Sequence, residues 1–220
     1  MRSLVVVRIV DEEMRAYYDR RAREYDDWWH GTGLFAQRDR PGWQEETIRL
    51  TEVLRSLLPA HVLDVACGTG FLTRHLRGEI VAIDQSPEMV RVAAARMPHA
   101  RVVVGDAVPL PFADGSFDRL VTGHFYGHLL PDERRAFVAE ARRVAPELVI
   151  VDSALRPGMP EEETQERVLE DGSHHRVFKR FLSGERLREE LGDGEILHEG
   201  EWFVVLVCTM PPTLGRTTTL

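Results

Sequence analysis

The sequence predicts a doubly wound α/β fold with a mostly parallel, seven-stranded sheet, a late antiparallel strand and helices at the amino terminus. Three observations lead to this fold class. From Val62 onward, short apolar segments able to form buried strands alternate with helical segments; two of the strands end in acids, Asp84 and Asp106; and a glycine-rich turn follows the first strand. Repeated strand–helix units predict a parallel sheet with right-handed crossovers and helices on both faces.

Two helices are expected before the first strand. Over residues 11–29, side chains recur on one helical face, and they are Met14, Tyr18, Ala22, Tyr25 and Trp29. A second helix is expected over residues 42–58, where Pro59 ends it. Residues 1–10 fit this pattern poorly, and we interpret them as a loosely attached extension.

The strand–helix repeats occupy the middle of the chain. After the strand that begins at Val62, further strands are expected over residues 79–84, 101–105, 117–122 and 147–152. The intervening helices are expected after the glycine turn as far as Leu76, over residues 86–97 and over residues 131–144. Ser86 followed by Pro87 is a typical helix start, with an N-cap and a proline in the first turn.

The pattern changes after Asp152. Residues 156–164 read as a loop or lid, and residues 168–182 as a hairpin or an extended excursion around Asp171-Gly172. A helix is expected over residues 183–192, followed by strands over 195–198 and 202–208 that form an antiparallel hairpin. The tail after Pro211 is expected to be disordered.

We expect a single domain over residues 1–220. Within it, residues 11–58 would form a helical cap and residues 60–152 a cofactor-binding core. Residues 153–182 would form a lid-like excursion, and residues 183–210 the closing helix and strands.

Charge and cysteine content argue against several classes of protein. With 28 basic and 36 acidic residues, the net charge of −8 repels the phosphates of nucleic acid. The two cysteines, Cys67 and Cys208, make no disulfide framework. The apolar run over residues 4–10 is too short to cross a bilayer, is interrupted by Arg8 and lacks a small-residue cleavage site. We therefore expect a cytoplasmic monomer or homodimer with no nucleic-acid or membrane partner.

The segment 62–72 carries the strongest functional signal. A buried strand leads through Asp64 into a turn that contains Gly68 and Gly70. Glycine reaches positive φ and lets a ligand approach the backbone, and a helix that starts after such a turn presents free N–H groups. A loop of this kind at the carboxyl end of a parallel strand is typical of a site for a nucleotide-like cofactor.

Four motifs in order resemble those of the class I S-adenosylmethionine-dependent methyltransferases, in particular the small-molecule branch. Residues 64–70 are similar to the first motif of that family, and Asp84 to the acidic end of its second strand. Residues 104–107 resemble the third motif, and residues 109–118 the lead into the fourth strand. The late antiparallel hairpin also matches this Rossmann-like family. The resemblance implies S-adenosyl-L-methionine as cofactor and methyl transfer as the reaction.

The resemblance and the chemistry of the side chains together suggest how the cofactor is held. Asp64 would attract its ammonium group, and Asp84 would accept from both ribose hydroxyls. Asp106 would accept from the adenine amino group, with Met89 against the adenine face. The predicted cofactor-binding residues are Tyr18, Tyr25, Asp64, Ala66, Gly68, Gly70, Asp84, Gln85, Met89, Asp106 and Ala107.

The segment after the fourth strand is expected to face the methyl acceptor. We interpret His124 as a catalytic general base or a side chain that contacts the cofactor. As a base it would take a proton near neutral pH, so that the rate falls as the pH drops through the histidine range. His128 has the i, i+4 spacing of a metal ligand, but Gly123 and Gly127 disfavour a regular helix and no third ligand is evident, so no metal is expected. Further candidates for the pocket wall are Tyr126, His174, His175 and Lys179.

Aromatic and histidine side chains suit a small, partly apolar acceptor that carries a hydroxyl or an amine. Two alternatives stay open. The turn nearly matches the dinucleotide fingerprint, although Thr73 stands in place of its third glycine or alanine, so a nucleotide-dependent oxidoreductase is one alternative. The other is a non-catalytic S-adenosylmethionine-binding protein, because binding motifs do not report turnover.

Overall fold

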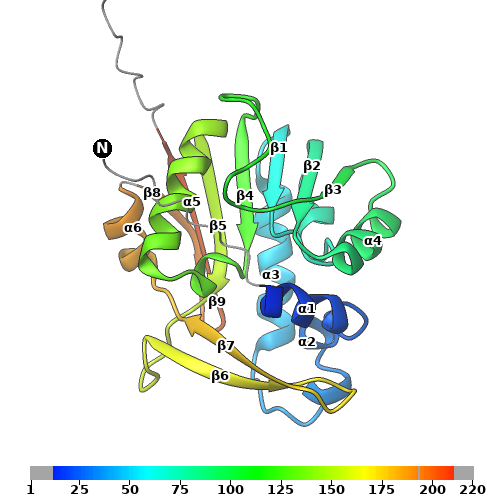
Figure 1. The fold of residues 1–220 in the computed structure, drawn as a ribbon. Helices are drawn as coiled ribbons and strands as arrows, with labels where there is room; N and C mark the ends of the chain where they lie inside the picture. Colours follow the sequence, from blue (N-terminus) through cyan, green and yellow to red (C-terminus); the bar gives the residue numbers. More distant parts are fainter. Residues whose placement is uncertain (1–11, 193, 211–220) are drawn as a thin grey trace, which may run out of the picture.

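The computed structural model describes residues 12–192 and 194–210, and its core is one seven-stranded sheet (Figure 1). The strands of this sheet are β1 (Ala60–Val65), β2 (Gly78–Asp84), β3 (Arg101–Val104), β4 (Arg119–Gly123), β5 (Glu147–Ser153), β8 (Gly194–Glu199) and β9 (Phe203–Thr209). Their order is β3-β2-β1-β4-β5-β9-β8. The first five are parallel, and β9 runs antiparallel to both β5 and β8. The predicted Rossmann-like fold class is confirmed.

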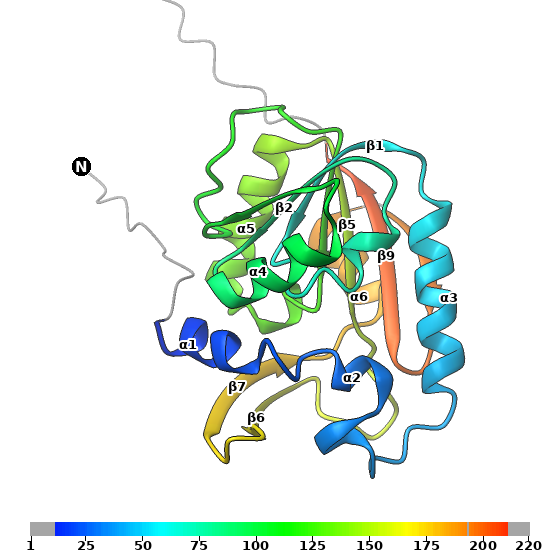
Figure 2. The same ribbon diagram turned by 90° about the vertical axis from the view of Figure 1, so that its right-hand side faces the viewer.

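Helices cover both faces of this sheet. Figure 2 shows α3 (Trp43–Ser56) on the opposite side from α5 (Pro131–Val144). Alternate strand residues enter separate cores, since successive strand side chains point to opposite faces. Leu63 and Leu148 belong to the core that also contains residues of α5 and of α6 (Gly184–Leu191). Val62 and Val149 belong to the core that contains residues of α3.

The start of α4 (Pro87–Arg96) agrees with its predicted capping signal. The Ser86 side chain accepts from the Met89 N–H, and Pro87 occupies the first turn, where no backbone donor is needed. Ala93 of this helix and Met97 just after it pack against Ala82 of β2. The N-terminus of α4 lies at the carboxyl end of β2, where the Ser86 N–H donates to Asp84.

A second layer of structure covers the carboxyl ends of the parallel strands. It consists of α1 (Glu12–Arg21), α2 (Asp27–His30), the short 3-10 helix η1 (Gly33–Phe35), and a hairpin of β6 (Glu162–Val168) and β7 (His174–Arg180) (Figure 1). Tyr17 of α1 packs with Leu169 and Val177 of the hairpin segment. The amino-terminal segment and the hairpin therefore meet over the edge of the sheet where the glycine turn lies.

The predicted helix after the glycine turn is wrong. Residues Thr73–His75 form only a short 3-10 helix, η2. Gly78 explains the difference, because a Cβ there would lie 2.0 Å from the Ala60 carbonyl oxygen, so the chain must already lie against β1 at that point. The segment between Gly70 and Gly78 is too short to form an α-helix and also return to the sheet.

The predicted helix over residues 11–29 is also wrong in part, since α1 ends at Arg21 and α2 begins at Asp27. Between them the chain is held to the core by Asp26, which accepts from the Thr69 hydroxyl at 2.6 Å and pairs with Arg96. A straight helix could not follow this path. The hairpin is wider than predicted, because β6 begins at Glu162, inside the expected loop.

Two predictions lie outside the described residues, namely the extension over residues 1–10 and the disordered tail after Pro211. None of the helices within residues 12–192 and 194–210 is long and apolar enough to cross a membrane. Cys67 is half-buried, Cys208 is buried, and neither forms a disulfide.

Candidate functional site

The glycine turn leaves the carboxyl end of β1 and is attached to β2. Gly68 has a φ of 55°, and its N–H donates to the Asp84 carboxylate at 2.8 Å. Gly70 has a φ of 73°, and a Cβ there would lie 2.7 Å from the Met97 side chain. Gly70 therefore lets the turn pack on α4. A Cβ on Gly68 would meet nothing closer than the Tyr25 ring, at 3.6 Å. Only the Gly68 side of the turn thus faces the space below the cap.

Two buried carboxyl groups flank this turn. Asp84 accepts from Gly68 through one oxygen and from the Ser86 N–H, at 2.9 Å, through the other. Burial raises the pKa of Asp84 to about 6, although these N–H groups partly oppose the shift. Asp64, in β1, accepts from the Thr73 hydroxyl, and burial raises its pKa to about 7. Both acids are therefore close to their titration range near neutral pH.

The amino-terminal segment lies directly over the turn. The Tyr25 ring covers Gly68, and its centroid lies 6.5 Å from that of Tyr18. Asp19 of α1 accepts from the Ser86 hydroxyl at 2.5 Å. The predicted cofactor-binding tyrosines are thus brought to the same edge as the predicted acids. Burial raises the pKa of Tyr18 to about 12, so its phenol stays protonated and can donate.

The other predicted cofactor residues lie along the same edge of the sheet. Ala66 has a φ of 58°, unusual for a residue with a Cβ, and it faces a small cavity at the turn. Gln85 and Asp106 follow β2 and β3 directly and are half-buried, as is Ala107. Met89 is completely buried in the first turn of α4.

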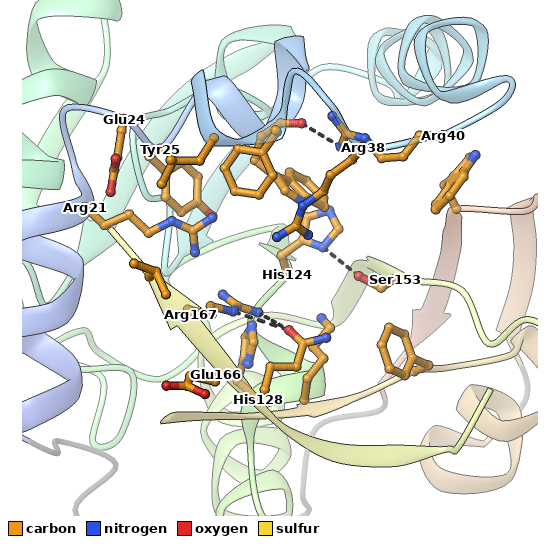
Figure 3. A pocket seen from close by; sticks show the side chains of 18 of the residues that line it. Arg21, Glu24, Tyr25, Arg38, Arg40, His124, His128, Ser153, Glu166 and Arg167 are labelled. Carbon is orange, nitrogen blue, oxygen red and sulfur yellow. Dashed lines mark hydrogen bonds between the residues drawn. The ribbon is translucent and has the colours of Figure 1, made fainter. Parts of the chain in front are cut away.

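A cavity of about 700 Å³ opens beside the turn, between the cap and the hairpin (Figure 3). Its lining includes aromatic side chains of the cap, among them Tyr18, Tyr25 and Trp28, together with His124. A smaller cavity at the turn is lined by Asp64, Ala66 and Cys67. Tyr25 and His124 line both cavities, so they lie where the two adjoin.

His124 occupies an unusual position at the end of β4. Its φ of 55° is in the left-handed region, and its ring contacts Trp28 and Trp29 edge-on, with centroids 4.9 Å and 5.2 Å apart. Nδ1 lies 3.4 Å from the Ser153 hydroxyl, whereas the buried Nε2 has no hydrogen-bond partner among the described residues. A buried polar atom without a partner is costly, and a bound ligand can satisfy it.

The electrostatic state of His124 differs from our expectation. Burial lowers its pKa to about 3, and repulsion by Lys179 acts in the same direction, whereas attraction by Asp152 opposes both. The imidazole is therefore neutral throughout the physiological range. The expectation that this histidine titrates near neutral pH is wrong, because sequence reasoning cannot see that the ring is buried among aromatic side chains.

A buried ion pair lies beneath His124. Lys179 donates to Asp152 at 2.6 Å, and Asp152 also accepts from the Gly127 N–H at 2.8 Å. Burial alone would raise the pKa of Asp152, but attraction by Lys179 and His124 lowers it to about 2. Asp152 Oδ1 lies 3.8 Å from His124 Nδ1, so this carboxylate helps to orient the imidazole.

Of the predicted wall residues, Lys179 lines the large cavity and the other three do not. Tyr126 lies in the 3-10 helix η3 (Tyr126–His128) and donates to Glu190, away from the cavity. His174 is exposed and pairs with Glu166, and His175 stacks against Tyr17. Alternation along β7 turns His174 outward, whereas His175 is on the same face as Lys179 but lies against Tyr17.

His128 lines the cavity, and its Nδ1 lies 2.6 Å from the Phe178 carbonyl oxygen, which agrees with a structural role. Within residues 12–192 and 194–210, no group of three or more His, Cys, Asp or Glu side chains is arranged to hold a metal ion.

Apart from Lys179, sequence reasoning missed the basic lining of the large cavity. Its basic side chains are Arg21, Arg38, Arg40, Arg156, Arg167 and Lys179. They come from the cap, from the loop after β5 and from the hairpin, so no local motif joins them. The available signal for Arg167 was the alternation of side chains along β6, which places Gln165 and Arg167 on the same face of the strand.

The sheet order, the antiparallel β9 and a glycine turn held by the acid at the end of β2 define the class of Rossmann-like methyltransferase domains. Comparison with known families agrees. Residues 62–147 match the family model described as "Methyltransferase domain". These features and the matches below make the chain similar to the class I S-adenosylmethionine-dependent methyltransferases.

Individual relatives support this family. Demethylmenaquinone methyltransferase of Thermotoga maritima is 37% identical over 101 residues, which cover 44% of this chain and 43% of that protein. Ajmaline N-methyltransferase of Rauvolfia serpentina is 34% identical over 128 residues, which cover 50% of this chain and 43% of that protein. The chain thus spans less than half the length of these curated relatives.

A solved structure extends the likeness beyond the motif region. A DhpI–SAM–HEP complex has a TM-score of 0.71 and 26% identity, and the match covers 90% of this chain and 96% of DhpI. The amino-terminal cap and the hairpin, which the family model does not include, are therefore largely within the matched region.

Proposed function

We propose that this protein transfers a methyl group from S-adenosylmethionine to a hydroxyl or amine of a small molecule. The observation that carries the proposal is the meeting of two cavities at Tyr25 and His124. The smaller one, of about 20 Å³, is lined by Asp64, Ala66 and Cys67 at the start of the glycine turn, where this family binds its cofactor. The larger one is a pocket of the size that small-molecule ligands require. The two reactants would therefore approach each other beside His124.

The residues at the turn fit the cofactor. The atoms nearest to an added Cβ on Gly68 all belong to the Tyr25 ring, the first at 3.6 Å, and Asp84 retains lone pairs for the ribose hydroxyls beyond its backbone partners Gly68 and Ser86. Asp64 would attract the ammonium group, and Tyr18 or Tyr25 would donate to the carboxylate. Asp106 and Met89 would contact the adenine. When bound, S-adenosylmethionine supplies an electrophilic methyl group on a sulfonium that leaves as a thioether.

His124 would act on the acceptor. Its neutral imidazole can accept the proton that an acceptor hydroxyl or amine loses as the new bond to the methyl carbon forms. Asp152 and Ser153 would hold the ring through Nδ1 and leave Nε2 for the acceptor. Alignment and exclusion of water supply the rest, and the aromatic wall formed by Trp28 and Tyr25 serves both purposes.

Binding and turnover test this function separately. By calorimetry we expect the protein to bind S-adenosylhomocysteine but not NAD, and a panel of small hydroxyl and amine compounds should yield substrates by adenosylhomocysteine release. Binding of NAD in its place would favour the oxidoreductase alternative. Cofactor binding without turnover on any acceptor would favour the non-catalytic alternative, and efficient methylation of RNA or DNA would overturn the small-molecule assignment.

His124→Ala should lower kcat about a hundredfold and change the Kd for adenosylhomocysteine by no more than about threefold, because the residue acts on the acceptor. The measurements are steady-state kinetics with the identified acceptor and calorimetry. His124→Asn is the matched control for backbone strain, since Asn tolerates positive φ but is not a base, and it should be equally slow. Full activity of either variant would remove His124 from the mechanism.

The affinity for adenosylhomocysteine should decrease as the pH is lowered from about 8 to 5.5, because protonation neutralises buried acids. The pKa of Asp64 is about 7 and that of Asp84 about 6, so the charged forms that attract the ammonium group and the hydroxyls prevail above these values and are lost below them. His124 does not contribute over this range. Calorimetry at several pH values measures the effect, and Asp84→Asn should reduce it. Binding that is independent of pH would contradict the assignment of both acids.

A further inference from the structure

The large cavity is strongly basic although the protein is acidic overall. The net charge of the chain is −8, yet the cavity lining contains six basic residues and two acidic ones, Glu24 and Glu166. Glu24 is engaged by the Glu170 N–H at 2.9 Å, and Glu166 pairs with His174. The positive charge is therefore concentrated at the site where the acceptor would bind.

Arg21 is a buried cation that forms no ion pair with a described residue, although its charge attracts Glu24 from a longer distance. Only 7% of the surface of Arg21 is exposed. Its guanidinium donates a hydrogen bond to the Tyr17 hydroxyl at 2.6 Å and lies against the rings of Tyr17 and Tyr25. No carboxylate of the described residues lies within salt-bridge distance of it. Burying an unpaired charge is unfavourable, and phenol contacts compensate only in part.

Arg167, on the opposite wall, is half-buried and forms no ion pair with a described residue either. It donates to the Gln165 side chain at 2.9 Å and 3.3 Å and to the Tyr17 hydroxyl at 3.4 Å, and these are neutral partners. Arg38 lies over the Phe35 ring, and its pKa is lowered by burial and then by repulsion from Arg167 and Arg21. Figure 3 shows Arg21, Arg38 and Arg167 pointing toward one space in front of His124.

Buried cations elsewhere in the described chain do have acidic partners. Arg180 pairs with Glu190, Arg119 with Glu147, and Lys179 with Asp152. Arg21 thus departs from a pattern that the other buried cations follow, and the half-buried Arg167 beside it also has no acidic partner among the described residues. A ligand with its own negative charge would supply the missing partner, and the planar guanidinium suits an oxyanion.

We propose that the methyl acceptor is an acidic small molecule whose oxyanion, a carboxylate or a phosphoryl group, is bound by Arg21, Arg38 and Arg167. Its hydroxyl or amine then faces His124. This assignment rests on the proposed function and adds the class of acceptor to it. The three arginines lie on different elements, namely α1, the loop after η1 and β6. The proposed anion site therefore needs both the cap and the hairpin to lie over the same cavity.

The first test is anion binding at constant ionic strength. Inorganic phosphate and acetate are titrated against the tryptophan fluorescence of the adenosylhomocysteine complex, because Trp28, Trp43 and Trp202 line the cavity. We expect a saturable change that sodium chloride does not produce. Tighter binding of phosphate assigns a phosphoryl group, and tighter binding of acetate assigns a carboxylate. The absence of a saturable change with either anion overturns the proposal, whereas failure to bind adenosylhomocysteine contradicts the proposed function itself.

Substitutions of the cavity arginines test where the anion binds. Arg38→Gln and Arg167→Gln should each weaken anion binding about tenfold, and Arg91→Gln, an exposed arginine of α4 paired with Glu88, should change it less than twofold. Because Arg38 is exposed, its variant is expected to fold, and melting curves confirm this for each protein. Equal binding by all of these variants would overturn the proposal.

Rates of methyl transfer to matched pairs of acceptors are an independent test of the acceptor class. Hydroxybenzoate is compared with hydroxybenzamide, and O-phosphoethanolamine with ethanolamine, by adenosylhomocysteine release. The acidic member of any active pair should have the higher kcat/KM, and Arg167→Gln should remove most of that difference. A preference for the neutral members would contradict an acidic acceptor while leaving methyl transfer itself established.

Discussion

Gly68→Val should abolish measurable binding of adenosylhomocysteine, with a loss of affinity of at least about a hundredfold. Gly68 has a φ of 55°, which a β-branched residue strongly disfavours, and the new methyl groups would occupy the space between the turn and Tyr25. A shift of the backbone at this position would also disturb the hydrogen bond that the Gly68 N–H donates to Asp84. Calorimetry measures the affinity, and circular dichroism should show a largely intact fold.

Gly115→Val is the matched control for backbone strain. Gly115 has a φ of 62° in an exposed loop, and nothing lies within 4 Å of an added Cβ. Its variant should carry a similar conformational cost and bind the cofactor normally. Near-normal binding by Gly68→Val, or an equal loss in the control, would count against the turn as the cofactor site.

Asp152→Ala should lower the free energy of unfolding by about 3–5 kcal/mol, measured by urea denaturation, because it leaves a charge buried without its partner. The Lys179 ammonium would lose its acceptor at 2.6 Å, and the Gly127 N–H would lose its own at 2.8 Å. With a folded-state pKa of about 2, Asp152 stabilises the protein above its ordinary pKa and loses this effect only as the pH falls below about 4.

The double variant Asp152→Ala with Lys179→Met distinguishes a stranded charge from lost packing. It removes the buried ammonium and should recover much of the stability that the single variant loses. A double variant no more stable than Asp152→Ala would place the loss in the backbone contacts of Gly127. A single variant within about 1 kcal/mol of the wild type would contradict a buried ion pair.

Local signals in the sequence determined most of the fold. Strand positions follow from runs of apolar residues and their lengths, and α4 and α5 follow from helical periodicity with a proline in the first turn. The acids that end β2 and follow β3 were visible because they interrupt apolar runs at fixed places. The family resemblance needed only these short segments, and the comparisons confirm it.

Some elements could not be predicted because tertiary contacts override local preference. The segment after the glycine turn has helical periodicity, yet Gly78 must lie against Ala60, so only a 3-10 turn fits. The cap helix stops at Arg21 because Asp26 is held by Thr69 and Arg96, which belong to other elements. Contacts with residues far away in sequence decided both outcomes, a close approach of backbone at Gly78 and hydrogen bonds at Asp26.

For the candidate site too, some features were predictable from the sequence and others depend on tertiary contacts. The sequence alone predicted the cofactor edge, because the carboxyl ends of adjacent parallel strands must meet, and it proposed His124 from its place after the fourth strand. Only the tertiary structure decided that His124 is buried and neutral, that Asp152 and Lys179 pair beneath it, and that Arg21, Arg38 and Arg167 converge. Charge state and burial depend on which side chains surround a group, and these come from the cap and the hairpin, which meet only after the chain has folded.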